Sequence, residues 1–216
     1  MEQSAKDVRS RRRLSTERTL STLARTWTAE RGLAGYTVEE LCEAAGVSRR
    51  TFFNYFASKE DAVLGMPNDR HDEHLTEAFL AGAADAERSE SGLSVTLIDD
   101  FVELFRGRWE ALEVTLDDAQ SFFAALEREP KLHRRVFDHM RASELIDIGL
   151  IEAREGLTAG DPRASTLVHL IGAINRIVVE EYFALHERDP DGPPLGIEVF
   201  ARMLRERVAL ARNLLR

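Results

Sequence analysis

The stretch GVSRRTFFNYFASKEDAV, residues 46 to 63, decides the fold because it combines two features that are usually found apart. Four aromatic residues within five positions are typical of a buried core, whereas the two arginines before them are typical of a surface. A helix can satisfy both demands, since residues four apart share a face. Phe52 and Phe56 then lie on a buried face, and Arg49 and Arg50 lie on an exposed one.

The residues around this helix predict a helix-turn-helix. Thr37 and Glu40 form a capping-box pattern that starts a helix over residues 38–45. Gly46 permits the left-handed backbone that the turn needs, and Ser48 can cap the second helix. Arginine and asparagine on such a second helix hydrogen-bond guanine and adenine edges. The pattern therefore favours DNA binding over a packed helical hairpin with solvated arginines.

The rest of the chain also predicts helices, and no alternating apolar run of strand length occurs. The first helix is expected to start at a cap on Ser15 and to stop at Gly32. A later helix is expected to be interrupted near Gly107. The last two expected helices span about residues 163–186 and 195–214. We therefore predict an all-α fold of about nine helices.

Charge is distributed unevenly along the 216 residues, whose net charge is −9. Residues 1 to 62 carry 11 Lys and Arg against 9 Asp and Glu, whereas the remainder carries 18 against 29. A basic segment in an acidic chain indicates that any nucleic-acid contact is confined to that segment.

Several classes of protein are excluded. A single cysteine, Cys42, indicates a reducing compartment, and the polar, basic N-terminus is not a secretory signal. No apolar run approaches the roughly 18 residues of a membrane span, so we expect a cytoplasmic protein with no membrane contact. Metal-ligand clusters, glycine-rich phosphate loops and nucleophile motifs are missing, so we expect neither an enzyme nor a cofactor.

The segment TVEELCEAAGVSRRTFFNYFASKEDAV resembles the N-terminal domain of the TetR/AcrR family of transcriptional regulators. The resemblance covers about residues 14–64, and it is carried by A-G-V-S at the turn, T-F-F-x-Y-F in the second helix and S-K-E-D after it. It implies a three-helix, helix-turn-helix DNA-binding domain over residues 1–64 with a basic arm. It also implies a helical ligand-binding and dimerisation domain over residues 65–216.

The resemblance also implies a role for each matching residue. The implied DNA-binding residues are Thr37, Ser48, Arg49, Arg50, Thr51, Phe53, Asn54, Tyr55 and Lys59. The two threonines and Lys59 would contact phosphates, and Ser48, the arginines and Asn54 would face base edges. The arm Arg11, Arg12 and Arg13 would reach the backbone or the minor groove, or remain a solvated tail.

Two positions differ from the commonest family pattern. Family members often have Tyr where Phe53 stands and His where Tyr55 stands. Phe53 has no hydroxyl group for a phosphate, and Tyr55 restores one two residues later. The phosphate contact has therefore moved to Tyr55 or has been lost.

Family members are homodimers, and the last two expected helices give an independent reason to expect one. Each carries a wide apolar stripe. The stripes are Leu167, Leu170, Ile171, Ile174, Ile177, Val178, Tyr182 and Leu185, and then Ile197, Phe200, Ala201, Leu204, Val208, Ala211 and Leu215. Two such helices from each chain would form a four-helix interface, unless both stripes serve only the core within one chain. A dimer also suits a palindromic DNA site.

A small-molecule effector is implied by the resemblance alone. The candidate ligand-binding residues are Phe105, Trp109, Phe122, Phe123, Phe137, Met140, Asn175 and Arg176, and plain core packing is the alternative for the apolar ones. Asn175 and Arg176 interrupt an apolar helix, so each needs a partner, which could be a ligand or, for Arg176, Glu180. RRTFFNYFASKEDAVLG is similar to family members tied to acyl-CoA-like ligands, which suggests an apolar or acyl-CoA-like effector.

The expected function is a dimeric repressor that a small-molecule effector releases from a palindromic operator. Binding of the effector would move the fourth helix, with a hinge at Pro67, and change the spacing of the two DNA-reading helices. The alternative is an activator or an effector-independent DNA-binding protein of the same fold. An adaptor that has lost DNA binding would not need Arg49, Arg50, Asn54 and Lys59.

Overall fold

The computed structural model describes residues 2–69, 72–84, 86–112, 115–188 and 196–214. Within these ranges the secondary structure is ten α-helices, one 3₁₀ turn and an isolated bridge between Arg88 and Ser94. The all-α prediction is therefore confirmed, with ten helices instead of about nine. No described helix is long and apolar enough to cross a membrane.

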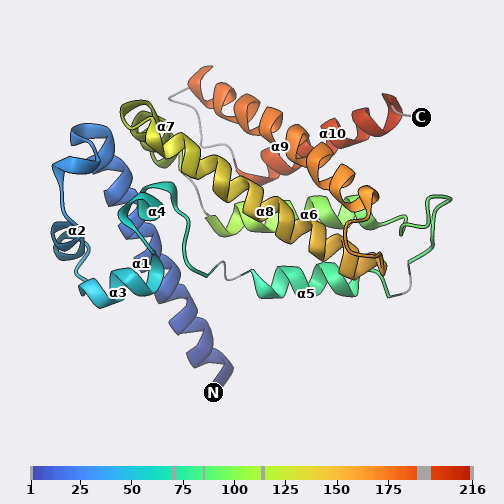
Figure 1. Ribbon diagram of the computed structural model, residues 1–216, viewed down its shortest axis with the longest axis horizontal. Helices are drawn as coiled ribbons and strands as arrows, with labels where there is room; N and C mark the ends of the chain where they lie inside the picture. The colour runs from blue at the N-terminus through green and yellow to red at the C-terminus, as the bar shows by residue number, and fades with distance from the viewer. Residues whose placement is uncertain (1, 70–71, 85, 113–114, 189–195, 215–216) are drawn as a thin grey trace. The chain divides into compact units, whose positions relative to one another are not determined.

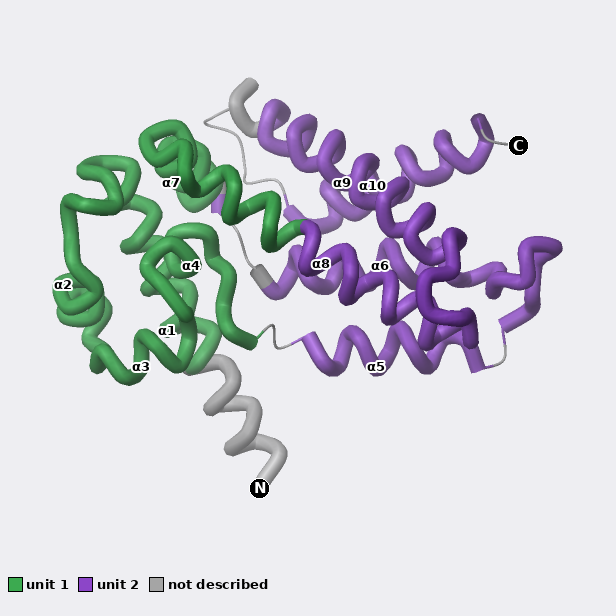
Figure 2. The backbone as a smooth tube through the Cα atoms, in the orientation of Figure 1, with its two compact units in different colours: residues 1–70, 117–140 green, residues 71–116, 141–216 purple. Residues whose placement is uncertain are grey.

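The helices follow the chain in a simple order (Figure 1). They are α1 (Glu2–Arg31), η1 (Leu33–Gly35), α2 (Val38–Ala44), α3 (Arg49–Tyr55), α4 (Lys59–Leu64), α5 (Glu73–Ala81), α6 (Leu97–Leu112), α7 (Leu116–Arg128), α8 (Lys131–Glu155), α9 (Pro162–Arg188) and α10 (Ile197–Leu214). Figure 2 shows the two compact units into which they fall. Unit 1 comprises residues 1–70 and 117–140, and unit 2 comprises residues 71–116 and 141–216.

Most of the expected helix boundaries are found, and one is wrong. Ser15 does not cap a helix, because it lies inside α1, where its carbonyl accepts a hydrogen bond from the Thr19 hydroxyl at 2.9 Å. The long helix opened by Asp161 and Pro162 is present as α9. Proline is tolerated in that first turn because the first N–H groups of a helix have no partner within it.

Unit 1 has a core to which both of its chain segments contribute. Its fully buried side chains include Leu20 of α1, Leu41 of α2, and Phe52 and Phe56 around the end of α3. Ala125, Leu126 and Leu132, from α7 and α8, belong to the same cluster. The predicted domain boundary after residue 64 stays a prediction, and the structure adds residues 117–140 to the unit that holds the helix-turn-helix.

Polar side chains fasten this second segment to the first. Arg135 of α8 donates two hydrogen bonds to the carboxylate of Asp61 in α4, at 2.6 and 2.7 Å. Thr22 of α1 donates to Asp118 of α7 at 2.6 Å. Helices α4 and α1 are thus joined to α8 and α7 by polar contacts as well as by apolar packing.

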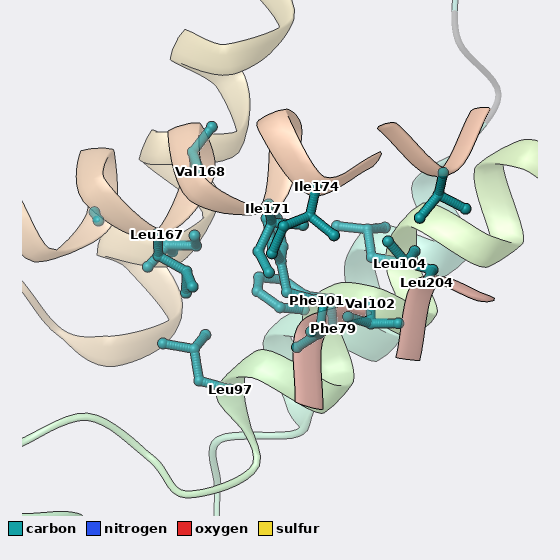
Figure 3. Packing of buried hydrophobic residues seen from close by; sticks show 14 of the residues in the cluster. Phe79, Leu97, Phe101, Val102, Leu104, Leu167, Val168, Ile171, Ile174 and Leu204 are labelled. Atoms are coloured by element: carbon teal, nitrogen blue, oxygen red, sulfur yellow. The ribbon is translucent and has the colours of Figure 1, made fainter. Parts of the chain in front are cut away.

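Unit 2 is a separate helical bundle around its own apolar core. In it α10 packs on α9 and α6, and α5 packs on α6. Figure 3 shows Phe79, Phe101, Ile171 and Leu204 converging in this core. The interruption expected near Gly107 is wrong, since α6 continues through this residue. An added Cβ at Gly107 would lie 2.7 Å from the Leu75 side chain, so the glycine lets α5 approach closely.

A charged group is buried on one side of this bundle. The side chain of Arg154 in α8 has no exposed surface, and its guanidinium donates to Asp100, to the Phe79 carbonyl and to Thr96. The adjacent Glu155 accepts hydrogen bonds from the backbone and hydroxyl of Ser94. A buried charge needs such partners, so this network ties the segment before α6 to α8.

Candidate nucleic-acid interface

The turn between α2 and α3 has the local chemistry that its sequence predicts. Thr37 and Glu40 form a capping box, with the Glu40 N–H 3.1 Å from the Thr37 hydroxyl and the Thr37 N–H 2.7 Å from the Glu40 carboxylate. Gly46 has a φ of 67°, and its Cβ position is open. Ser48 accepts a hydrogen bond from the Thr51 N–H at 3.0 Å. Both helices therefore start where predicted.

Helix α3 has one buried face and one exposed face. Phe52 is fully buried, as is Phe56 at the C-cap, and the two rings pack with their centroids 5.9 Å apart. Arg49, Arg50 and Asn54 are exposed, and Phe53 is 42% exposed. A short helix anchored by aromatic rings can present the opposite side to a groove of DNA.

The two adjacent arginines are in different settings. Arg49 forms an ion pair with Glu39 of α2, with 2.5 Å between Nη1 and Oε1, and its guanidinium lies over the Phe53 ring. No hydrogen bond or ion pair joins Arg50 to the part of the chain that the structure describes. The Glu39 contact was not predicted, because a separation of ten residues across a turn carries no local sequence signal.

The hydroxyl groups expected to meet phosphates are partly engaged already. The Thr37 hydroxyl donates to Glu40 at 2.9 Å, and the Ser48 and Thr51 hydroxyl oxygens lie 2.8 Å apart. Ser48 remains exposed, and Thr51 is half-buried. These residues fix the starts of the two helices, and their predicted contacts with DNA stay predictions.

Lys59 has contacts that its predicted role did not include. Its ammonium group donates hydrogen bonds to the carbonyls of Leu33 and Tyr36, and its Nζ lies 4.3 Å from the centroid of the Tyr36 ring. The side chain is half-buried. Lys59 therefore joins the start of α4 to the residues between α1 and α2, and any phosphate contact would add to this role.

The C-terminal end of α3 meets the link after α4. The Asn68 N–H donates to the Tyr55 carbonyl, and its side chain reaches two further carbonyls of α3. Arg13 of α1 lies over the Tyr55 ring, with 5.6 Å between its guanidinium carbon and the ring centroid, and pairs with Asp69 at 3.5 Å. The predicted arm residues Arg11 and Arg12 lie outside the residues whose side chains the structure describes.

A carboxyl group with an unusual protonation lies beside this contact. The pKa of Glu17 in α1 is raised from 4.5 to about 7, mainly by burial; Arg13 opposes the shift and Asp69 adds to it. Its Oε2 atom is buried without a hydrogen-bond partner among the described residues. Because a buried carboxylate without partners is costly, Glu17 takes up its proton near neutral pH.

The predicted ligand-binding residues divide between the two units. Phe105, Trp109, Asn175 and Arg176 belong to unit 2, whereas Phe122, Phe123, Phe137 and Met140 belong to unit 1. Phe122 packs against the core of unit 1, and the other three residues of that group are exposed.

Among the four residues of unit 2, the polar neighbours Asn175 and Arg176 differ. The Arg176 side chain is 67% exposed and lies 4.0 Å from Glu180, which agrees with the alternative of an ion pair on the surface of α9. The Asn175 Oδ1 atom is buried and has no hydrogen-bond partner among the described residues. The two aromatic residues of this group, Trp109 and Phe105, pack on Phe200 and Phe101 of the core.

Comparison with known proteins identifies relatives of the chain. Residues 22–64 match the family described as "Bacterial regulatory proteins, tetR family". Over 168 residues the chain is 30% identical to the HTH-type transcriptional regulator TcmR of Streptomyces glaucescens, which covers 75% of this chain and 70% of the relative. The second similarity therefore continues far beyond the helix-turn-helix.

Proposed function

Since this chain belongs to the tetR family of bacterial regulatory proteins and is a transcriptional regulator, we propose that it binds a palindromic operator as a homodimer. We propose repression as its mode of action, because repression is the usual mode in this family, and release by a small-molecule effector. DNA would be contacted by α3 in the major groove.

The exposed face of α3 is the observation that carries this proposal. Arg50 and Asn54 are exposed residues on the side opposite the buried Phe52. Arginine reads guanine and asparagine reads adenine through paired hydrogen bonds in the major groove. A helix of seven residues reads few base pairs, so two copies related by a twofold axis are needed for a specific site.

An exposed apolar row on α9 supports the homodimer. Of the apolar residues expected on this helix, Ile171, Ile174 and Val178 are buried in the core of unit 2. Leu170, Ile177 and Leu185 are exposed on the same helix. One part of the apolar stripe is thus buried in the core of unit 2, and another part is exposed. The exposed part suits a helix that packs against a second copy of the chain. Leu215, predicted in the α10 stripe, lies outside the described residues.

The unpartnered oxygen of Asn175 supports an effector site in unit 2. A buried carbonyl oxygen without a donor is unfavourable, and a ligand with an N–H or O–H group would supply the missing hydrogen bond. Phe105 and Trp109 of the same unit are partly buried aromatic residues, and they suit the apolar or acyl-CoA-like effector expected from the sequence.

Selection of duplexes from a random DNA pool tests DNA binding directly. The purified protein should enrich a palindrome, and fluorescence anisotropy on the winning duplex should show weaker binding by Arg50→Ala and Asn54→Ala. Each substitution should cost about 1–3 kcal/mol of discrimination at one position of each half-site. Arg202→Ala, which removes an exposed arginine of α10, is the matched control. Weak, salt-sensitive binding with no enriched sequence would contradict the proposal.

Sedimentation of Ile177→Glu tests the homodimer, since a charge on the exposed row of α9 should yield monomers. Glu180→Ala is the control on the same helix.

Titration of acyl-CoA esters into the complex with the operator then tests release. A protein that binds the palindrome and ignores every effector supports the effector-independent alternative.

A further inference from the structure

Glu39 is an acidic residue in the first turn of α2 whose side chain takes no part in the capping box and lies beside α3, the proposed recognition helix. Its neighbour Glu40 closes the capping box of that helix, and the side chain of Glu43 one turn later is exposed and forms no hydrogen bond or ion pair with the described residues. The described contact of Glu39 is with Arg49, at 2.5 Å between Oε1 and Nη1. Its carboxylate therefore contacts the first residue of α3.

The pair is poorly placed to stabilise the fold. The side chains of Arg49 and Glu39 are 65% and 57% exposed, and exposed ion pairs contribute little to stability because water screens them. A surface carboxylate next to α3 would also repel the phosphates of a bound duplex. The ion pair itself therefore adds little to stability, and the charge of Glu39 does not favour general binding to DNA.

The contact with Glu39 instead orients the Arg49 side chain. The guanidinium is held between the Glu39 carboxylate at 2.5 Å and the Phe53 ring, whose centroid lies 5.5 Å from the guanidinium carbon. A side chain held in this way loses less rotational freedom on binding than a free one. Its remaining N–H groups still suit the O6 and N7 atoms of guanine.

The carboxylate also biases Arg49 away from phosphates. An arginine whose charge is already paired gains less from the DNA backbone, and contacts with the backbone carry no sequence information. Arg50 has no such partner among the described residues and keeps its full attraction to phosphate and bases alike. We therefore expect the contacts of Arg49 to depend more on the DNA sequence than those of Arg50.

We propose that Glu39 is a specificity-determining residue that positions Arg49 to read one guanine in each half-site. The inference rests on the proposed DNA-binding function and deepens it. It assigns base reading at one position to a pair of residues from the two different helices of the helix-turn-helix.

Base preference, more than affinity, is the property to measure. Duplexes are selected from a random pool by the unmodified protein and by Glu39→Gln, Arg49→Ala, the double variant and Glu43→Gln. Arg49→Ala should lose the preference for guanine at one position by about tenfold or more, the discrimination that a paired arginine contact provides. Glu39→Gln should lose part of the same preference, at the same position only, and bind scrambled duplex more tightly.

The controls separate positioning from simple charge removal. Glu43→Gln removes a charge from the same helix and should leave the base preference unchanged. The double variant should match Arg49→Ala, because Glu39 acts through Arg49. Equal thermal unfolding of Glu39→Gln and the unmodified protein would show that folding is intact.

Two results would overturn the inference and leave the proposed function standing. In one, Glu39→Gln keeps the guanine preference and binds all duplexes more tightly by one factor, so that Glu39 is only a repelling charge. In the other, Arg49→Ala keeps the same base preference as the unmodified protein. Failure of the unmodified protein to enrich any sequence would instead contradict the proposed function itself.

Discussion

Asn68 closes the C-terminal end of α3, because its backbone N–H donates to the Tyr55 carbonyl at 2.7 Å. Its side-chain amide lies 3.2 Å from the carbonyl of Phe53 and 3.4 Å from that of Asn54. The last carbonyls of a helix have no partner within it. Asn68 therefore supplies hydrogen bonds to three successive residues that end α3, from the link that follows α4.

Replacing Asn68 by alanine should weaken the end of α3. The variant loses both side-chain hydrogen bonds and keeps the one from its backbone, so the free energy of unfolding should fall by about 0.5–1 kcal/mol. Operator affinity should fall as well, since Asn54 and Tyr55 lie in the affected turn. Urea denaturation and anisotropy measure the two effects. Asn213→Ala, at an exposed position of α10, is the control and should change neither.

Glu17 should make stability depend on pH around neutrality. Because its pKa is raised from 4.5 to about 7, the folded protein binds the proton more tightly than the unfolded chain. Its contribution to stability is therefore fully present below pH 4.5 and is lost as the pH rises to about 7. Glu17→Gln should raise the free energy of unfolding at pH 8 by about 1 kcal/mol, after allowance for partial exposure.

Urea denaturation of both proteins at pH 5 and pH 8 measures this effect. The difference between Glu17→Gln and the unmodified protein should be larger at pH 8. Glu30→Gln, at an exposed position of the same helix, should show no such difference. An equal effect of Glu17→Gln at both pH values would argue against a raised pKa.

The contact between Asp61 and Arg135 should stabilise unit 1. Burial alone would raise the pKa of Asp61, but hydrogen bonds from Arg135 and Ser58 outweigh burial and hold the pKa below its ordinary 3.8. The stabilisation is therefore present above pH 3.8 and is lost as the pH falls through the lowered pKa. Arg135→Ala should lower the free energy of unfolding by about 1–2 kcal/mol at pH 7.

Thermal unfolding of Arg135→Ala and Arg134→Ala tests this prediction. Arg134 is an exposed neighbour on α8 whose side chain forms no hydrogen bond or ion pair with the described residues, so its removal should leave the melting temperature unchanged. Equal melting temperatures for the two variants would mean that the Asp61 contact contributes nothing measurable.

A substitution of Lys59 separates a role in folding from a role in DNA binding alone. Lys59→Met keeps the aliphatic stem and removes hydrogen bonds to two carbonyls, so it should lower the free energy of unfolding by about 1–2 kcal/mol. A lysine that contacts only phosphate would change operator affinity and leave unfolding unaffected. Lys131→Met removes a mostly exposed lysine and is the control in the same denaturation series.

The local chemistry of the helix-turn-helix could be predicted because its causes lie close together in sequence. Thr37, Ser48 and Ser58 each cap a helix by accepting a hydrogen bond from a residue three positions later. Phe52 and Phe56 could be assigned to a buried face from their spacing alone. The error at Ser15 has the same origin, since a serine followed by helix-forming residues is equally compatible with the interior of a longer helix.

The contacts that could not be predicted join residues far apart in the chain. Asp61 and Arg135 are 74 residues apart, and Thr22 and Asp118 are 96 apart. Aspartate, arginine and threonine are common on helices, and nothing local to any of these residues indicates its partner. For the same reason, the sequence could not predict that Phe122 and Phe137 belong to unit 1 and Phe105 to unit 2.

Assembly of unit 1 from two separate stretches of the chain limits how this regulator can be recombined. A chimera that exchanged only residues 1–64 for those of a relative would set Ala125, Leu126 and Leu132 against a foreign surface. It would also remove Asp61 from Arg135. An exchange of the whole segment therefore has to preserve these contacts, or carry residues 117–140 along with it. Residues 1–64 are therefore not expected to fold correctly when they are transferred without residues 117–140.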